Sequence, residues 1–151
     1  MIKIVCVGKI KEKYLNDAIN EYKKRLSSYT RLDIIELSDE SFQDIEKIKK
    51  QEGEKILSKV SIKDFVITLE IEGNQLTSSN FADLMDKTLI NNSNLTFIIG
   101  GSYGLSQEVI NRSNYHLSFS KMTFPHQLFR VLLLEQLYRA YKINNNESYH
   151  K

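Results

Sequence analysis

Residues 121–130, KMTFPHQLFR, place a histidine and an arginine shortly after the only proline of the chain. His126 can exchange a proton near neutral pH, and Arg130, about one helical turn later, can stabilise negative charge on an oxygen. Together these side chains could accept a proton and stabilise the charge left behind. Simpler interpretations are also consistent with the pattern: His126 as an exposed first-turn residue, and Arg130 as a clamp for a phosphate or a carboxylate.

A second pair of reactive side chains ends the chain. Tyr149 offers a flat ring that could stack on a base, and His150 titrates near neutral pH. The last residues of a chain are normally frayed. Only the short polar stretch 144–148 separates this tail from a long apolar helix pattern, so we expect the tail to be able to fold back toward a pocket.

The glycine-rich stretch FIIGGSYG, residues 97–104, is a third candidate feature. Its glycines, Gly100, Gly101 and Gly104, have neither the spacing of the dinucleotide fingerprint nor the Lys-Ser/Thr pair of a triphosphate loop. They could simply mark a strand exit that needs positive φ angles. Alternatively, a bare glycine turn lets a flat ligand approach main-chain amides and carbonyls closely.

The elements that must position these groups follow from hydrophobic patterning. Strands are predicted at 2–7, 32–37, 65–71, 95–99 and 116–119, and the turn signal Gly73-Asn74 closes the third of them. Helices are predicted at 13–27, at 42–60 with a break or bend near Gly53, and at 107–111. A further helix runs from a cap at Ser79 or Asn80 to residue 89, and Pro125 is the first residue of a long last helix. This alternation predicts an α/β fold with a mostly parallel sheet and flanking helices, in a single domain spanning 1–151. Ligands are then expected at the carboxyl ends of the strands.

The composition of the chain is typical of a globular protein and excludes few functions. The chain is 41% hydrophobic with a net charge of +2, typical of a globular domain and not by itself an indication of nucleic-acid binding. The lone Cys6 lies in an apolar run, which favours an inert thiol in a reducing compartment. No apolar run approaches the ~20 residues of a membrane span. We therefore expect a cytoplasmic protein, and the absence of ligand-spaced His, Cys and acidic clusters predicts no metal site.

The last helix pattern carries more apolar surface than one core requires. Residues 128–141 are apolar around most of the helix circumference. A homodimer formed through this helix would explain the pattern, and a central helix of a monomer is the alternative. The lysines at 9, 11 and 13 form either a solvated face or a grip on RNA phosphates.

The chain resembles small SPOUT-class methyltransferases of the RlmH type in three stretches, which follow one another in the order IIGGSYG, LSFSKMTFPHQLFRVLLLEQLYRAYKI and a terminal YHK. The likeness runs nearly end to end from VGKIKEKY, and residues 41–59 are its least diagnostic part. The resemblance implies methylation of N3 of a pseudouridine in 23S ribosomal RNA of the large subunit, with assembled ribosomes as substrate. It also implies a carboxyl-terminal trefoil knot that binds S-adenosylmethionine.

The family pattern assigns roles to matching residues. It places the cofactor on Leu69, Gly100, Gly101, Phe119, Ser120, Lys121, Met122, Thr123 and Phe124, and the chemistry on His126, Arg130, Tyr149 and His150. Two other functions stay open from the residues themselves: an α/β nucleotide-binding protein of another class, for example one that uses NAD, and an RNA-binding module without catalysis.

Overall fold

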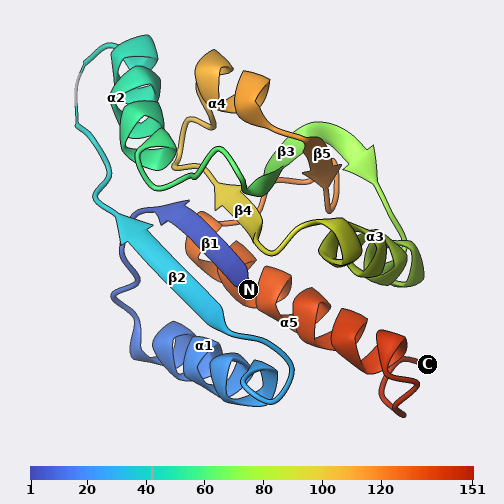
Figure 1. Ribbon diagram of the computed structural model, residues 1–151. Helices are drawn as coiled ribbons and strands as arrows, with labels where there is room; N and C mark the ends of the chain where they lie inside the picture. The colour runs from blue at the N-terminus through green and yellow to red at the C-terminus, as the bar shows by residue number, and fades with distance from the viewer. Residues whose placement is uncertain (42) are drawn as a thin grey trace.

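The computed structural model describes residues 1–41 and 43–151. In chain order the elements are β1 (Ile2–Val7), α1 (Lys13–Leu26), β2 (Leu32–Leu37), α2 (Ile45–Leu57), β3 (Phe65–Gln75), α3 (Ser78–Asn91), β4 (Leu95–Ile99), α4 (Gln107–Arg112), β5 (Tyr115–Ser118) and α5 (His126–Asn144). The strands form one sheet in the order β2-β1-β4-β3-β5, and every neighbouring pair is parallel (Figure 1). The predicted α/β fold with a parallel sheet is confirmed.

Helices cover both faces of the sheet (Figure 1). α1, α3 and α5 pack on one face, and α2 and α4 pack on the other. Side chains of β1 alternate accordingly: Ile4 and Cys6 belong to the core under α5, whereas Val5 and Val7 belong to the core under α2 and α4. Burial of each such aliphatic side chain stabilises the fold by roughly 1.5–3 kcal/mol. Covered faces on both sides explain why the central strands read as continuous apolar runs.

The predicted interruption of the second helix is wrong, because α2 runs without a break through Gly53. A Cβ at this position would lie 2.4 Å from Ser106 Oγ, at the start of α4. The glycine therefore permits close packing of α2 on α4. The prediction also began this helix at Phe42, which lies outside the described residues.

Further boundaries differ from the prediction, among them the start of α3, which is capped by Thr77 instead of Ser79 or Asn80. β3 does not end at the Gly73-Asn74 signal: its pairing with β5 is interrupted after Leu69 and resumes at Asn74. Pro125 precedes α5 as its N-cap residue instead of being its first helical residue, because its ψ of 132° is extended. Its carbonyl still accepts the Phe129 N–H at 2.9 Å, so the proline fixes the entry of the chain into the helix.

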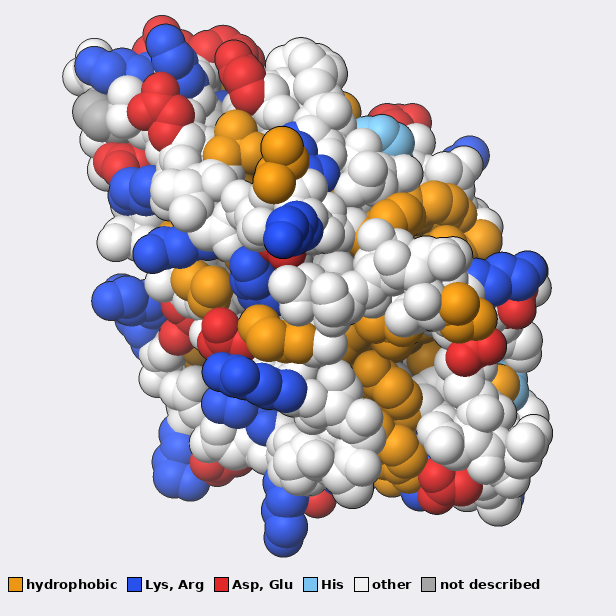
Figure 2. All heavy atoms as spheres, in the orientation of Figure 1, with side chains coloured by type: hydrophobic (Ala, Val, Ile, Leu, Met, Phe, Trp, Pro, Cys, Tyr) orange, Lys and Arg blue, Asp and Glu red, His pale blue; other side chains and the backbone are white. Residues whose placement is uncertain are grey.

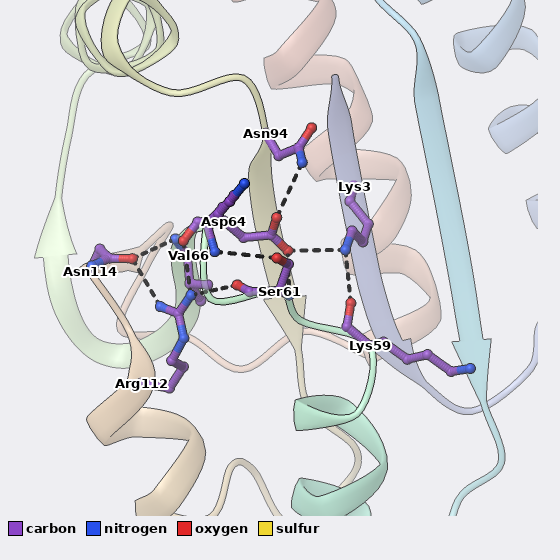
Figure 3. A network of polar contacts seen from close by, with 9 residues as sticks. Lys3, Lys59, Ser61, Asp64, Val66, Asn94, Arg112 and Asn114 are labelled. Atoms are coloured by element: carbon purple, nitrogen blue, oxygen red, sulfur yellow. Dashed lines mark hydrogen bonds and ion pairs between the residues drawn. The ribbon is translucent and has the colours of Figure 1, made fainter.

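A buried carboxylate ties the amino ends of three strands together (Figure 3). Asp64, which precedes β3, accepts hydrogen bonds from Lys3 Nζ at 3.0 Å, the Ser61 N–H at 2.9 Å and Asn94 Nδ2 at 3.3 Å. Burial alone would raise the pKa of Asp64, but the Ser61 N–H, the Lys3 hydrogen bond and the Lys3 charge outweigh it and lower the pKa overall. This cluster lies at the amino ends of the strands, opposite the edge where ligands are expected.

α5 packs against both α1 and α3. Leu133, Leu134 and Leu137 are fully buried beneath the sheet, whereas Leu128 on the outer side of the helix is 39% exposed. None of the helices formed by the described residues is long and apolar enough to cross a membrane.

Candidate functional site

A cavity of about 540 Å³ opens beside the interruption in β3, where β4 and β5 end and α5 begins. Its walls include the following residues named from the sequence: Leu69, Gly100, Gly101, Phe119, Ser120, Met122, Thr123, Phe124 and His126. Lys121 of the same loop is exposed and does not line the cavity. The fold therefore places a ligand-sized cavity at the carboxyl edge of the sheet, as expected for parallel strands.

The glycine turn contributes bare main chain to this cavity. A Cβ on Gly100 would lie 2.9 Å from Leu105 Cδ2 and 3.1 Å from the Gly104 carbonyl group. A Cβ on Gly101 would lie 3.0 Å from Oε1 of Glu52, a buried carboxyl behind the turn whose pKa is raised chiefly by burial. Gly104 adopts a φ of +87°, which disfavours other residues. The need for positive φ is confirmed at Gly104, and the residues packed around Gly100 and Gly101 leave no room for a side chain. The approach of a flat ligand to this main chain stays a prediction.

The loop after β5 forms the apolar wall. The Phe119 and Phe124 rings both pack on Phe129 of α5, with centroids 4.8 and 6.2 Å from it. The Ser120 hydroxyl accepts the Met122 N–H at 3.0 Å and so holds the loop's bend. The loop is thus fixed by aromatic packing and local hydrogen bonds while its inner side borders the cavity.

His126 stands at the rim where α5 begins. Its Nε2 lies 3.1 Å from where a Cβ on Gly8 would be, so Gly8, at a φ of +93°, makes room for the ring. Burial, and then the nearby Arg130 charge, lower the pKa of His126 below its ordinary 6.5, and Asp39 only partly opposes them. The imidazole is consequently neutral at pH 7 and able to accept a proton.

Arg130 lies deeper than the sequence suggested. The residue is 1% exposed and does not line the cavity. Its guanidinium donates to Glu36 Oε2 at 2.8 Å and to the carbonyls of Val7 and Gly8 at 2.9 and 2.7 Å. This geometry corresponds to the carboxylate clamp, which joins α5 to the carboxyl ends of β1 and β2.

The terminal tail packs on the second half of α5. The Tyr149 hydroxyl donates to Glu135 Oε2 at 2.7 Å, and His150 Nδ1 lies 3.1 Å from Arg139 Nη1. The hydrogen bond to Glu135 raises the pKa of Tyr149 to about 12. Glu135 is nine positions after His126, about 13 Å along the helix axis. The tail is ordered against the helix, and the structure does not bring it into the cavity of its own chain.

Sequence reasoning missed several cavity residues. The chemically distinct one is Glu70, whose carboxylate follows Leu69 directly in the cavity wall. Its signal was present in the sequence, because a charged residue directly follows the apolar run of residues 65–69 at the carboxyl end of a predicted strand. Other missed wall residues are Ile71, Ile99, Ser102, Leu105, Leu117, Ser118 and Phe129, whereas Gly104 and Pro125 belong to the turn and the helix start that the sequence had singled out.

Cationic side chains gather on one side of the molecule. Figure 2 shows lysine and arginine side chains along the side formed by α1, β2 and α2. Lys9 and Lys11, exposed in the loop after β1, belong to the same end of the sheet as His126. Such a surface can attract a polyanion.

Comparison with known proteins identifies the family. The family model described as "Predicted SPOUT methyltransferase" matches residues 1–150. Curated relatives named ribosomal RNA large subunit methyltransferase H are 56% identical in Clostridium perfringens and 57% identical in Clostridioides difficile, with 99% of each chain covered. A solved structure of a probable methylase family protein from Haemophilus influenzae Rd KW20 shares the fold, with a TM-score of 0.58 at 14% identity over 99% of this chain and 70% of that one. With its parallel sheet and glycine-walled cavity, this chain belongs to the SPOUT methyltransferase family.

Proposed function

We propose that this protein transfers a methyl group from S-adenosylmethionine to N3 of a pseudouridine in 23S ribosomal RNA of the large subunit. The observation that carries the proposal is the cavity of about 540 Å³ between the glycine turn and the loop 119–124. It occurs in a chain more than half identical to curated ribosomal RNA methyltransferases. The same relatives favour this function over an NAD-dependent enzyme or a non-catalytic RNA-binding module.

The cavity suits an adenosyl ligand. Gly100 and Gly101 present bare main chain to the cavity, because Leu105 and Glu52 behind the turn leave no room for side chains there, and Leu69 and Phe119 supply apolar walls. Met122, Thr123 and Phe124 complete the enclosure. When bound, S-adenosylmethionine supplies an electrophilic methyl carbon attached to a sulfonium. We further propose that the segment around this cavity forms the trefoil knot typical of the family.

His126 is the proposed proton acceptor. N3 of a pseudouridine carries a proton that must leave before or during attack on the methyl carbon. The lowered pKa of His126 keeps the ring neutral at pH 7, and its place at the cavity rim brings it close to a base entering there. Activity should therefore fall as pH drops through the lowered pKa of His126, at a midpoint below 6.5.

Arg130 acts as a positioning residue in this proposal. Its hydrogen bonds to the Val7 and Gly8 carbonyls fix the end of β1 against the first turn of α5. Because Gly8 also packs against His126, the clamp fixes the place of the imidazole. The remaining apolar cavity walls exclude water, which favours a reaction in which a cationic methyl donor and an anionic nitrogen neutralise each other.

A homodimer is part of the proposal. One side of α5 carries residues at intervals of three or four positions: Leu128, Leu132, Glu135 and Arg139. Figure 2 shows hydrophobic side chains at the surface where α5 lies between α1 and α3. The tail packs on the same side through its contacts with Glu135 and Arg139. A second copy on this face would receive Tyr149 and His150 at the boundary, where they could contact RNA bound at the second cavity.

The decisive experiment is methyl transfer to ribosomes. Purified protein is incubated with S-adenosylmethionine and ribosomes that lack the modification, and the 23S RNA is digested and analysed by mass spectrometry for N3-methylpseudouridine. The His126→Gln variant serves as the matched control, with the same S-adenosylhomocysteine affinity and reduced transfer expected. No transfer to either ribosomes or free 23S RNA by the wild-type protein would contradict the proposed function.

A further inference from the structure

The interrupted pairing of β3 places Glu70 in the wall of the cavity. Leu69 and Asn74 of β3 both pair with Leu117 of β5, so residues 70–73 lie outside the ladder. Gly73 closes this bulge tightly, because a Cβ there would lie 2.8 Å from the Leu117 carbonyl carbon. Bulges of this kind redirect side chains near functional sites. Here the redirected side chain is Glu70, which lines the cavity.

The Glu70 carboxylate is held on one of its oxygens. Thr68 Oγ1 lies 2.6 Å from Oε2, and His116 Nδ1 makes a short hydrogen-bond contact with the same oxygen. Thr68 is fully buried and also contacts Ser113 Oγ at 2.8 Å. Oε1 has no hydrogen-bond partner among the described residues. The carboxylate is therefore oriented by the protein and keeps a free acceptor.

This carboxylate stands out in the wall of the cavity. Among the described residues that line it, Glu70 alone carries a carboxylate, and His126 is the other ionisable side chain. The Glu70 side chain is only 18% exposed. A ligand that fills the cavity beside apolar Leu69 displaces water from the Glu70 carboxylate. The ligand must then offer hydrogen-bond donors to this carboxylate to replace the lost water.

We propose that Glu70 accepts hydrogen bonds from the ribose hydroxyls of the adenosyl ligand, with His116 and Thr68 as positioning residues. The inference rests on the proposed function, since it concerns the same cavity. Hydroxyl donors suit the enclosed carboxylate, because pairing with an ammonium group would remove a second charge from water. A ribose diol also offers two donors at fixed spacing to one carboxylate.

Calorimetric titration with two ligands tests the assignment. S-adenosylhomocysteine carries both the ribose and the amino-acid part, whereas 5′-methylthioadenosine carries the ribose alone. Glu70→Gln should weaken both ligands by a similar factor, about tenfold or more, as expected for loss of a charged hydrogen-bond acceptor. Glu72→Gln, an exposed residue of the same bulge, is the matched control and should change neither affinity by more than about twofold.

The outcomes separate the two proposals. Failure of the wild-type protein to bind S-adenosylhomocysteine would overturn the proposed function itself. Wild-type binding with equal affinity in Glu70→Gln would overturn the role of Glu70 alone, and a loss confined to S-adenosylhomocysteine would assign the carboxylate to the amino-acid part instead. If Glu70→Gln does not fold, as judged by its thermal transition, Glu70→Asp provides the test, because the shorter carboxylate should also weaken both ligands.

The positioning role of His116 is tested in a double-mutant cycle. His116→Asn should weaken both ligands in the wild-type background by a smaller factor than Glu70→Gln. In the Glu70→Gln background it should add no further loss, since the carboxylate it orients is gone. Additive losses in the double variant would contradict action through Glu70.

Discussion

Substituting Gly100 should weaken binding of the adenosyl ligand without unfolding the protein. A Cβ at this position would lie 2.9 Å from Leu105 Cδ2 and 3.1 Å from the carbonyl carbon and oxygen of Gly104. The Leu105 side chain can rotate, but Gly104 contributes main chain, so the glycine turn itself must move. Gly104 also lines the cavity, and the turn's displacement changes the surface on which the ligand rests.

The magnitude follows from the cost of overpacking. Inserting a methyl group into a closely packed site typically costs about 1–3 kcal/mol. The free protein avoids much of this cost by shifting the turn. A ligand that needs the original turn forces it back on binding, so the overpacking cost is then subtracted from the binding free energy. Gly100→Ala should therefore weaken S-adenosylhomocysteine by about 5- to 150-fold, and Gly100→Val, with two more methyl groups, by at least about 100-fold.

Isothermal titration calorimetry with S-adenosylhomocysteine measures this series. Thermal unfolding of each unliganded variant shows whether the fold is retained. We expect a retained fold, because the clash is local to the turn. The affinity should fall in the order Gly, Ala, Val. A folded Gly100→Val protein that binds within about twofold of the wild type would refute the assignment of the ligand to the glycine turn.

Three further predictions concern assembly, the tail and stability. Light scattering at micromolar concentration should give the mass of two chains, and Leu132→Glu should give that of one; a wild-type mass of one chain would contradict the dimer. Deletion of residues 149–151 should leave folding and S-adenosylhomocysteine affinity intact while nearly eliminating methyl transfer to ribosomes, and full activity would refute the tail's role. Asp64→Asn should lower the free energy of unfolding at pH 7 by about 3 kcal/mol, because Lys3 would keep a largely buried, unpaired charge. Since the pKa of Asp64 is lowered on folding, its stabilisation is present above the ordinary carboxyl pKa and is lost as pH falls through the lowered value. Urea unfolding at pH 7 and near pH 3 measures the difference in free energy of unfolding between the wild type and Asp64→Asn. This difference should be smaller near pH 3, and an equal difference at both pH values would contradict the ion pair.

Local sequence patterns predicted the elements well where local physics decides them. The strands Ile2–Val7, Leu32–Leu37 and Leu95–Ile99 begin and end as predicted, because β-branched apolar runs end at polar residues or glycines. Their alternation with helices was enough to predict a parallel sheet and a site at its carboxyl edge. The predicted cofactor loops line the cavity for the same reason, since both follow strands directly.

The bulge in β3 depended on tertiary packing. Gly73 and Asn74 read as a turn, but the strand continues: Asn74 and Gln75 pair again with β5, which lies more than forty residues later in the chain. Gly53 likewise reads as a helix break, although its role is to admit Ser106. Neither partner is near in sequence, so no local pattern contains this information.

The sequence alone determined which chemical groups were present and which of them followed strands: the glycine turn, the loop 119–124 and His126. Only the tertiary structure decided what surrounds each group. It buried Arg130 against Glu36 and two carbonyls, docked Tyr149 on Glu135, and placed Glu70 in the cavity wall. The reason is physical: a charged side chain's role depends on its solvation and its partners, and both are set by contacts between residues that are often far apart in the chain.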